Sequence, residues 1–421
     1  METRATTMHT LHPIENFAEP EVHFLKVEEN LPDDKAHTLH IRYFKSKNPD
    51  APTVIYLHGG PGAGSDMTQA QLFNPEDYNI ILLDQRGAGK STPKGEMREN
   101  NTENLIEDLE KIRELFGLEK WVVAGGSWGS TLGLGYAEKY PERVSVIIMR
   151  GVFFARAEDT VGFLNDDSRA AKAHPKEWKY FKEETNKLLK TAGLPFLPEK
   201  ISGDLNDKNS PLYAIINSYY DLLQGEDKEL AAQAAGVFTF WEKTVSFLQP
   251  NAEGLSWATD PDGINMGLTE VTYMKKDWFL KENQLVDDLR IIKEAGIPVF
   301  IVHGKHDLVC SPKCAQIVKD NLAPGQVTYF QSEAGHAGSE PDTINYLVQA
   351  AKLARPLVQK NENENKNETE EKGDEKKKSA HMKLSMMNKD KGLAKKLVNL
   401  DIEELSKQKK DVKNVPVRKL S

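Results

Sequence analysis

Short apolar runs alternate with helical patterns over roughly the first third of the chain. Six of these runs predict strands: EVHFLKV, HTLHIRYF, TVIYLH, YNIILLD, KWVVAG and VSVIIMR. The last four are almost continuously apolar, which is typical of strands covered on both faces. Helical spacing follows at 102–117 and 128–140, so strand and helix alternate. This alternation predicts a parallel α/β sheet.

The pattern changes between residues 155 and 290, where helix-forming residues dominate and no convincing strand is found. Strand character returns afterwards in IPVFIVHG and QVTYFQ, with helical patterns at 312–322 and 341–354. A helical insertion that interrupts one sheet explains this order better than two successive domains. We therefore predict one α/β core, formed by residues 20–154 and 291–356, with a helical cap or lid over 155–290.

From residue 357 the apolar periodicity is lost. The stretch VQKNENENKNETEEKGDEKKKSAHMK has few hydrophobic residues and many charges, so it cannot bury enough surface to offset the entropy of ordering. We predict that residues 357–421 form a disordered tail. Within it Leu393, Leu397 and Leu400 have helical spacing. This spacing fits either a helix that binds a protein partner or a marginal helix that frays when alone.

Composition and charge narrow the class of protein. The chain has 421 residues, of which 39% are hydrophobic, enough for a sizeable core. It has no apolar run long enough to cross a membrane, and METRATTMHTLHPIENF lacks the apolar stretch of a secretory signal. We expect a cytoplasmic protein without membrane contact. The net charge is −9, and residues 361–421 hold 16 bases and 12 acids, so the rest carries −13 and offers no nucleic-acid surface.

The two cysteines, Cys310 and Cys314, lie four residues apart without nearby histidine or cysteine partners. This is a poor arrangement for a metal site, so we expect reduced thiols and no metal. The stretch RGAGKST resembles a phosphate-binding loop, but Asp84 stands where that motif requires its first glycine. We therefore expect no nucleotide cofactor.

A candidate nucleophile lies in VVAGGSWGSTLG. Ser127 stands between Gly125 and Gly129 in a G-x-S-x-G pattern, directly after a predicted strand and before a predicted helix. This context indicates a nucleophile elbow, a turn so tight that its neighbouring positions must be small. The serine oxygen then lies at a helix N-terminus, where amide groups stabilise developing negative charge. The plainer alternative is a Gly-Ser turn without chemical role.

A nucleophilic serine needs a base and an acid that orients it, in the chain order serine, acid, histidine. His336, in SEAGHAGSEP, follows the last predicted strand on a loop flanked by glycines. Asp307, in VHGKHDLVC, follows the preceding strand, and active sites of α/β sheets gather at such strand ends. We predict these two residues as base and acid. His303 lies within the strand and reads as a core histidine, whereas His306 remains an alternative base.

An oxyanion hole would need two backbone donors. The residue after the nucleophile, Trp128, supplies one. The second is expected from a loop after an early strand, and in YLHGGPGAGS the glycines let the main chain approach a ligand. We choose Gly60 as this donor. An ordinary Gly-Pro turn is the alternative.

Several motifs together resemble the prolyl aminopeptidases, also called proline iminopeptidases. They are HGGPG, DQRGAGKSTP, GGSWGSTLGLGYAEKYPERV, RGVFFAR, Asp307 followed by Cys310, and GHAGSEP. The resemblance covers about residues 20 to 355. It implies the α/β-hydrolase fold, with a mostly parallel eight-stranded sheet, helices on both faces and a helical cap. It also implies release of N-terminal proline from short peptides by a serine peptidase without metal or cofactor.

The resemblance also implies that Glu242, in FTFWEKT, and Glu270, in LTEVTYM, hold the amino group of the substrate. The residues offer independent support, because Glu242 borders an apolar helical stripe and has no Lys or Arg at the neighbouring helical positions. Two carboxylates brought together without a partner have raised pKa values until a cation arrives. A peptide's terminal ammonium is such a cation. On the residues alone, two solvated glutamates on helix surfaces remain the alternative.

The proline pocket follows the family less closely. Phe153, in RGVFFAR, matches a pocket aromatic of the family, but Met274 stands where an aromatic residue usually follows the tyrosine. Methionine is apolar and adaptable, so a proline ring can still be buried while alanine competes. GKHD also departs from the usual Gly-Arg-Tyr-Asp before the acid, which puts neither the acid nor the fold in question.

Two other functions fit parts of the sequence. An esterase or a general aminoacyl amidase would use the same triad and oxyanion hole, but a neutral ester offers the two glutamates nothing to bind. A non-catalytic binding protein on this scaffold typically lacks triad members, whereas all three candidates are present here.

Overall fold

The structure, a computed structural model, describes residues 8–249 and 261–358. These residues belong to one compact unit, Met1–Val358. Residues 357 and 358 of the predicted tail are helical, so its predicted start is two residues too early; the remainder, with the helical spacing of its three leucines, lies outside the described residues.

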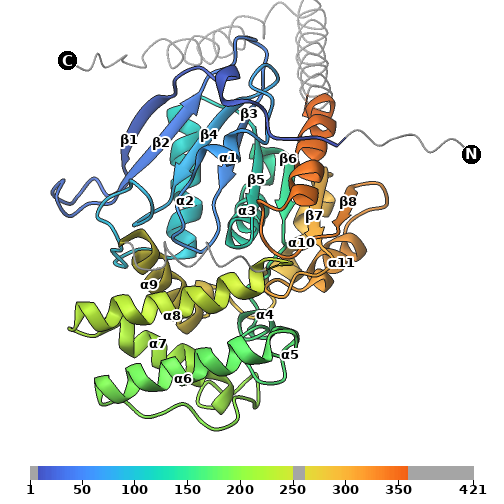
Figure 1. Cartoon of the computed structure of the whole chain (residues 1–421). Coiled ribbons are helices and arrows are strands. Elements are labelled where there is room, and N and C mark those ends of the chain that lie inside the picture. The colour runs from blue at the N-terminus through green and yellow to red at the C-terminus, as the bar shows by residue number, and fades with distance from the viewer. Residues whose placement is uncertain (1–7, 250–260, 359–421) are drawn as a thin grey trace, which may run out of the picture. The chain divides into compact units, whose positions relative to one another are not determined.

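Eight strands form one sheet (Figure 1) in the order β1-β2-β4-β3-β5-β6-β7-β8. Strand β2 runs antiparallel to both of its neighbours, and all other neighbouring strands are parallel. The mostly parallel eight-stranded sheet is thereby confirmed. The strands are β1 (Glu21–Lys26), β2 (Thr38–Phe44), β3 (Thr53–Leu57), β4 (Asn79–Asp84), β5 (Trp121–Gly126), β6 (Val144–Arg150), β7 (Val299–Gly304) and β8 (Val327–Ser332).

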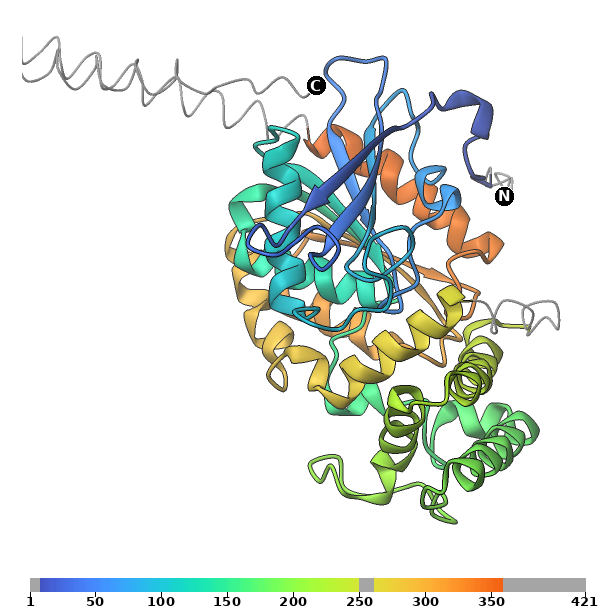
Figure 2. The same ribbon diagram turned by 90° about the vertical axis from the view of Figure 1, so that its left-hand side faces the viewer.

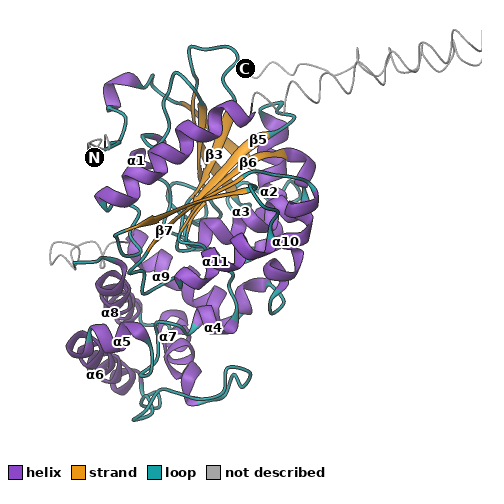
Figure 3. Ribbon diagram, turned by 90° about the vertical axis from the view of Figure 1, so that its right-hand side faces the viewer, coloured by secondary structure: helices purple, strands orange, loops and turns teal. Residues whose placement is uncertain are grey.

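Helices cover both faces of this sheet, as Figures 2 and 3 show. Helix α1 and the helix over residues 341–358 enclose one apolar layer, whereas α2, α3, α10 and α11 enclose the other. The central strands β3 to β6 are buried almost throughout, as their continuous apolar runs predicted. These helices are α1 (Met67–Ala70), α2 (Thr102–Leu115), α3 (Trp128–Lys139), α10 (Gln284–Glu294) and α11 (Pro312–Asn321).

Between β6 and β7 the described residues form six further α-helices, which we call the inserted helices. They are α4 (Ala157–Thr160), α5 (Arg169–Ala173), α6 (Pro175–Ala192), α7 (Ala214–Gln224), α8 (Lys228–Ser246) and α9 (Pro261–Lys275). In Figure 1 they gather beyond one end of the sheet, and no strand interrupts them within the described part of this segment.

Aromatic packing holds the inserted helices together. The Trp241 ring of α8 lies 4.8 Å from Trp178 and 5.8 Å from Phe181, both on α6. Phe181 in turn stacks on Tyr219 of α7 at 5.7 Å. Burial of an aromatic side chain contributes a few kcal/mol, about 1.5 to 3 for a phenylalanine. The apolar face of α8 is therefore a core of the inserted helices, and Glu242 comes directly after its central tryptophan.

The strand order places two loops side by side at one edge of the sheet. Strand β3 lies between β4 and β5, with Leu57 in register with Gly125. The chain therefore leaves β3 toward one side and β5 toward the other. Ligand sites of open α/β sheets form at such a switch of strand order, beyond the carboxyl ends of the strands.

Candidate active site

Ser127 lies in the tight turn between β5 and α3 and has a positive φ of 55° with ψ −125°, angles that non-glycine residues rarely adopt. Its neighbours have no room for side chains. A Cβ on Gly125 would lie 2.5 Å from the Gly129 carbonyl oxygen, and a Cβ on Gly129 would overlap the Leu57 carbonyl oxygen. The backbone strain of Ser127, a non-glycine residue with a positive φ, is of a kind found at functional sites. The glycines of the motif are therefore required by close backbone approach.

The structure brings Ser127, His336 and Asp307 together in one chain of hydrogen bonds. The Nε2 atom of His336 lies 3.1 Å from the Ser127 Oγ, and its Nδ1 lies 2.8 Å from Asp307 Oδ2. The other carboxylate oxygen of Asp307 accepts the amides of Val309, at 2.9 Å, and Cys310, at 2.8 Å. An Nδ1 proton donated to Asp307 leaves Nε2 free to take the serine proton.

The electrostatics of this group suit a neutral base beside an ionised acid. Burial alone would raise the pKa of Asp307, but the neighbouring His336 and His303 outweigh it and hold that pKa well below its usual range. Burial lowers the pKa of His336, and the charge of Arg150 lowers it further, against the opposite effect of Asp307. Near neutral pH the imidazole is therefore uncharged and able to accept a proton.

The other two candidate histidines have different partners, although His303 Nε2 also lies 3.4 Å from Asp307 Oδ2. His303 is fully buried, its Nδ1 accepts the amide of Val152 at 3.2 Å, and its Nε2 donates to the Cys310 carbonyl oxygen at 3.0 Å. It is the core histidine that was predicted. His306, the alternative base, is exposed and lies 3.1 Å from the Glu333 carboxylate. Its ring is engaged at the surface, whereas the His336 ring contacts the serine.

The glycine loop after β3 lies beside the nucleophile. A Cβ on Gly59 would lie 3.4 Å from Ser127 Cβ, and Gly60 has a φ of 102°, which residues with a side chain rarely adopt. The amide of Trp128 belongs to the first residue of α3, directly after Ser127. The two main-chain segments predicted to form an oxyanion hole are therefore both next to the serine.

Gln85, which sequence reasoning did not single out, ties these two sides together. Its Nε2 donates to the His58 carbonyl oxygen at 3.0 Å, and its Oε1 accepts the indole N–H of Trp128 at 2.9 Å. The residue is buried and comes directly after β4. Its place just past a strand end, next to Asp84 of the DQRG motif, is the signal that could have identified it.

Glu242 on α8 and Glu270 on α9 are brought together, and their carboxyl groups hydrogen-bond each other. Glu270 is only 4% exposed, and its Oε2 has no hydrogen-bond partner among the described residues. Burial raises the pKa of Glu242 to about 7. Burial and the adjacent Glu242 raise the pKa of Glu270 well above its usual range. The charge of Lys243 lowers the pKa of Glu242 by less than burial raises it, so a cation that entered would stabilise the ionised pair.

Both glutamates are carried by helices that contact the loops around Ser127. The carbonyl oxygen of Ser246, at the end of α8, accepts the amide of His336 at 2.7 Å. On α9, Thr269 lies so close to the glycine loop that a Cβ on Gly62 would be 3.1 Å from its Cβ. Glu242 precedes Ser246 by one helical turn, and Glu270 follows Thr269 directly. The carboxylate pair is therefore anchored to the histidine loop through one helix and to the glycine loop through the other.

The residues predicted for an apolar pocket are buried near these elements. The Phe153 ring lies 4.8 Å from that of Trp278, which stacks on Trp128 at 5.7 Å. Met274 is buried on α9, one turn after Glu270. An aromatic wall thus leads from the residue after the nucleophile to Phe153, while Met274 shares the helix of the carboxylate pair.

Arg150 is a second neighbour of the site that the sequence did not reveal. Its Nη1 donates to the His336 carbonyl oxygen at 2.8 Å and lies 3.2 Å from the His336 Nε2. It also stands so close to the elbow that a Cβ on Gly126 would be 2.6 Å from its guanidinium. Arg150 ends β6, so the same strand-end reasoning that selected Asp307 could have selected it.

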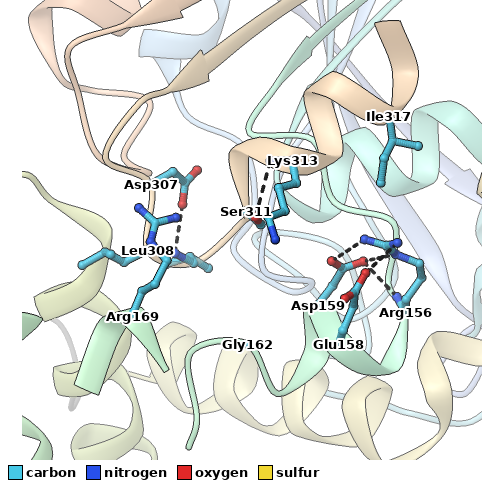
Figure 4. Close-up of a pocket in the computed structure, with 11 residues that line it drawn as sticks. Arg156, Glu158, Asp159, Gly162, Arg169, Asp307, Leu308, Ser311, Lys313 and Ile317 are labelled. Carbon is cyan, nitrogen blue, oxygen red and sulfur yellow. Dashed lines mark hydrogen bonds and ion pairs between the residues drawn. The ribbon is translucent and has the colours of Figure 1, made fainter. Parts of the chain in front are cut away.

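A pocket of ≈ 220 Å³ is lined in part by Asp307 and Leu308 (Figure 4). Its Arg156 pairs with Asp159, Nε to Oδ2 at 2.8 Å, and with Glu158 at 2.7 Å. The Cys314 thiol lies 3.4 Å from the Asp159 carboxylate. These contacts join α4, the first inserted helix, to α11 of the core, so the charged residues here fix the start of the insertion.

Two further properties of the described residues concern metal binding and membrane contact. No group of three histidine, cysteine, aspartate or glutamate side chains within 8–249 and 261–358 could hold a metal ion. Over the same ranges, no helix is both long enough and apolar enough to pass through a membrane. Cys310 and Cys314 are buried and unpaired with each other.

Comparison with known proteins identifies related sequences. Residues 52–340 match the α/β hydrolase fold family. A proline iminopeptidase from Arabidopsis thaliana is 32% identical over 354 residues, which covers 82% of this chain and 86% of the relative. A proline iminopeptidase from Neisseria meningitidis is 32% identical over 320 residues, which covers 75% of this chain and 93% of the relative.

Proposed function

The chain belongs to the α/β hydrolase fold family and, within it, to the proline iminopeptidases, so it is a serine hydrolase with peptidase activity, and we propose that it releases N-terminal proline from short peptides. In this proposal the inserted helices form a cap over the site. The cap holds the free amino group of the substrate, and the core supplies the chemistry.

The chemical steps follow from the hydrogen-bond chain. Ser127 Oγ attacks the carbonyl carbon of the first residue while His336 Nε2 takes its proton and Asp307 orients the ring. The amides of Gly60 and Trp128 stabilise the oxyanion. His336 then gives the proton to the departing amine, and the peptide bond breaks. Water attacks the resulting ester in the same way and releases proline.

The observation that carries the proposal is the buried pair of Glu242 and Glu270. Two carboxyl groups share one hydrogen bond with one oxygen left unpartnered among the described residues, and burial outweighs the effect of the Lys243 charge on Glu242. Further positive charge would stabilise their ionised form. The terminal ammonium of a peptide supplies that charge and two or more N–H donors. Holding the first nitrogen fixes the first carbonyl in place, so cleavage occurs after one residue.

Apolar surroundings support proline as that residue. Phe153 and Met274 are buried and offer no polar groups in their side chains, which suits a small aliphatic ring. We propose these two residues as part of the pocket. Because methionine is flexible, alanine is expected to be the main competing first residue.

A broader esterase or amidase is the competing function, and one comparison separates the two. Turnover of a prolyl anilide is measured beside that of a short-chain aryl ester, with Ser127→Ala as the inactive control. The proposal expects the anilide to have the higher kcat/KM, because only the anilide has an ammonium for the glutamates. A preference for the ester would contradict it.

A further inference from the structure

Four residues after His336, the side chain of Glu340 joins two separate parts of the chain. Its Oε2 accepts the amide of Gly335, on the histidine loop, at 2.6 Å. Its Oε1 accepts the amide of Leu248, just after α8, at 3.0 Å. Hydrogen bonds to a carboxylate are roughly twice as strong as those between neutral groups. Both oxygens of this residue therefore serve to connect α8 with the loop that carries the base.

The two connected segments are in direct backbone contact. The Ser246 carbonyl oxygen accepts the amides of both His336, at 2.7 Å, and Ala337, at 2.8 Å. A Cβ on Gly335 would lie 2.8 Å from this oxygen and 2.8 Å from the Leu248 amide nitrogen. The approach is closer than a side chain at Gly335 would allow, so the two segments have one defined register.

Glu340 is itself held by the rigid core. Its carbonyl oxygen accepts the amide of Ile344 at 3.0 Å, in the first turn of the helix over residues 341–358. That helix buries Leu347, Ala350 and Ala354 against the sheet. The carboxylate therefore projects from a fixed base toward the end of α8.

We propose that Glu340 is a positioning residue that keeps the carboxylate of Glu242 in register with the catalytic serine. This rests on the proposed function, because it assigns Glu242 to the amino group of the substrate. Glu242 lies four residues, or about 6 Å of helix, before Ser246. A displacement of the end of α8 therefore displaces Glu242 by nearly the same distance as that end. A misplacement of about 1 Å can lower a rate roughly 100-fold.

The triad has supports that do not involve Glu340. His336 keeps its bond to Asp307 at 2.8 Å, and its carbonyl oxygen keeps the bond from Arg150 at 2.8 Å. Both partners lie on core strand ends. Loss of the Glu340 carboxylate should therefore impair substrates held by the amine while the reactivity of Ser127 is retained.

The test uses the full chain and two reactions. Turnover of a prolyl anilide needs the amine anchor, whereas labelling of Ser127 by a fluorophosphonate probe needs only the triad. We expect Glu340→Ala to lower kcat/KM for the anilide by about 10- to 100-fold and to change the labelling rate by less than about threefold. Glu340→Gln, which retains one acceptor oxygen, should show a smaller loss. It also tests the proposal if the alanine variant does not fold.

Glu333→Gln is the matched control, because Glu333 lies on the same loop but is exposed and bonded to Lys305 and His306. It should behave as the wild type. Anilide turnover retained in Glu340→Ala would overturn the proposal, as would an equal loss of turnover and labelling. A wild-type chain that is labelled but does not cleave the anilide would contradict the proposed function, and this assignment with it.

Discussion

Replacing Glu242 by glutamine removes one negative charge from the buried pair and preserves the shape of the side chain. The substrate ammonium would then face one carboxyl group, Glu270, which is buried and whose raised pKa favours its protonated form. We expect prolyl anilide turnover to fall sharply while the fold is retained.

The size of the loss can be worked from the environment of the pair. Removing one partner of a buried, hydrogen-bonded charge pair costs about 2 to 5 kcal/mol. Since about 1.4 kcal/mol corresponds to a factor of ten, kcat/KM should fall by roughly 30- to 5000-fold. Because the pKa of Glu242 is about 7, its carboxyl group is mostly ionised at about pH 8. At that pH, Glu242→Gln therefore removes almost one full negative charge.

Glu270→Gln should be milder, because glutamine resembles the protonated carboxyl group that burial already favours at this position. Releasing that proton takes about 1.4 kcal/mol for each unit by which the pKa exceeds the pH. The advantage of the wild type over Glu270→Gln should therefore shrink as the pH falls from about 9 to about 6. At each pH the loss should remain smaller than in Glu242→Gln.

The assay is kcat/KM for a prolyl anilide across this pH range, with thermal unfolding to check the fold. Glu229→Gln is a control on the same helix, because Glu229 is exposed in the first turn of α8 and should change kcat/KM by less than about twofold. Activity of Glu242→Gln within about threefold of wild type would refute the assignment of the anchor. A greater loss in Glu270→Gln than in Glu242→Gln would refute the placement of the shared proton.

Three further outcomes follow from the geometry. Gly129→Ala should lower the free energy of unfolding by at least about 3 kcal/mol in denaturant titrations, because the added Cβ overlaps a β3 carbonyl oxygen. Its control is Gly267→Ala, whose added Cβ would lie 3.6 Å from its nearest neighbour and should be tolerated. The rate of fluorophosphonate labelling should fall with decreasing pH only below pH 6.5, where His336 protonates. The kcat/KM for the anilide should already fall near pH 7, where Glu242 also protonates. Two pH profiles that fall at the same pH would contradict this. In Arg150→Gln the labelling rate should begin to fall at a higher pH, because a charge that lowers the pKa of His336 is removed. An unchanged pH profile would show that Arg150 does not lower this pKa.

The sheet could be predicted from local sequence because strand character depends mainly on neighbouring residues. The runs TVIYLH and VSVIIMR are apolar over their whole length, and the strands they form, β3 and β6, are buried almost throughout. The elbow at Ser127 was equally readable, because Gly125 and Gly129, the residues that must lack side chains, both belong to the motif, although Gly129 is crowded by Leu57 of β3.

Contacts between distant segments were less accessible. The Arg150 guanidinium reaches the loop of His336, 186 positions later, and no periodicity of the chain encodes that pairing. The bond from Leu248 to Glu340 spans 92 positions and depends on where α8 ends. The meeting of Glu242 with Glu270 was inferred from family resemblance, because two helices must cross at one angle to bring the carboxyl groups together. Local patterns determine such elements but leave their mutual placement open.

The central claim is that the buried carboxylate pair requires a free N-terminal amine. The most direct test compares a prolyl anilide with its N-acetylated form in the wild-type protein at about pH 8. Acetylation removes the positive charge and leaves the scissile bond unchanged, so the loss should approach that of a removed buried charge, roughly 30- to 5000-fold in kcat/KM. Equal cleavage of the acetylated and free substrates would contradict the account.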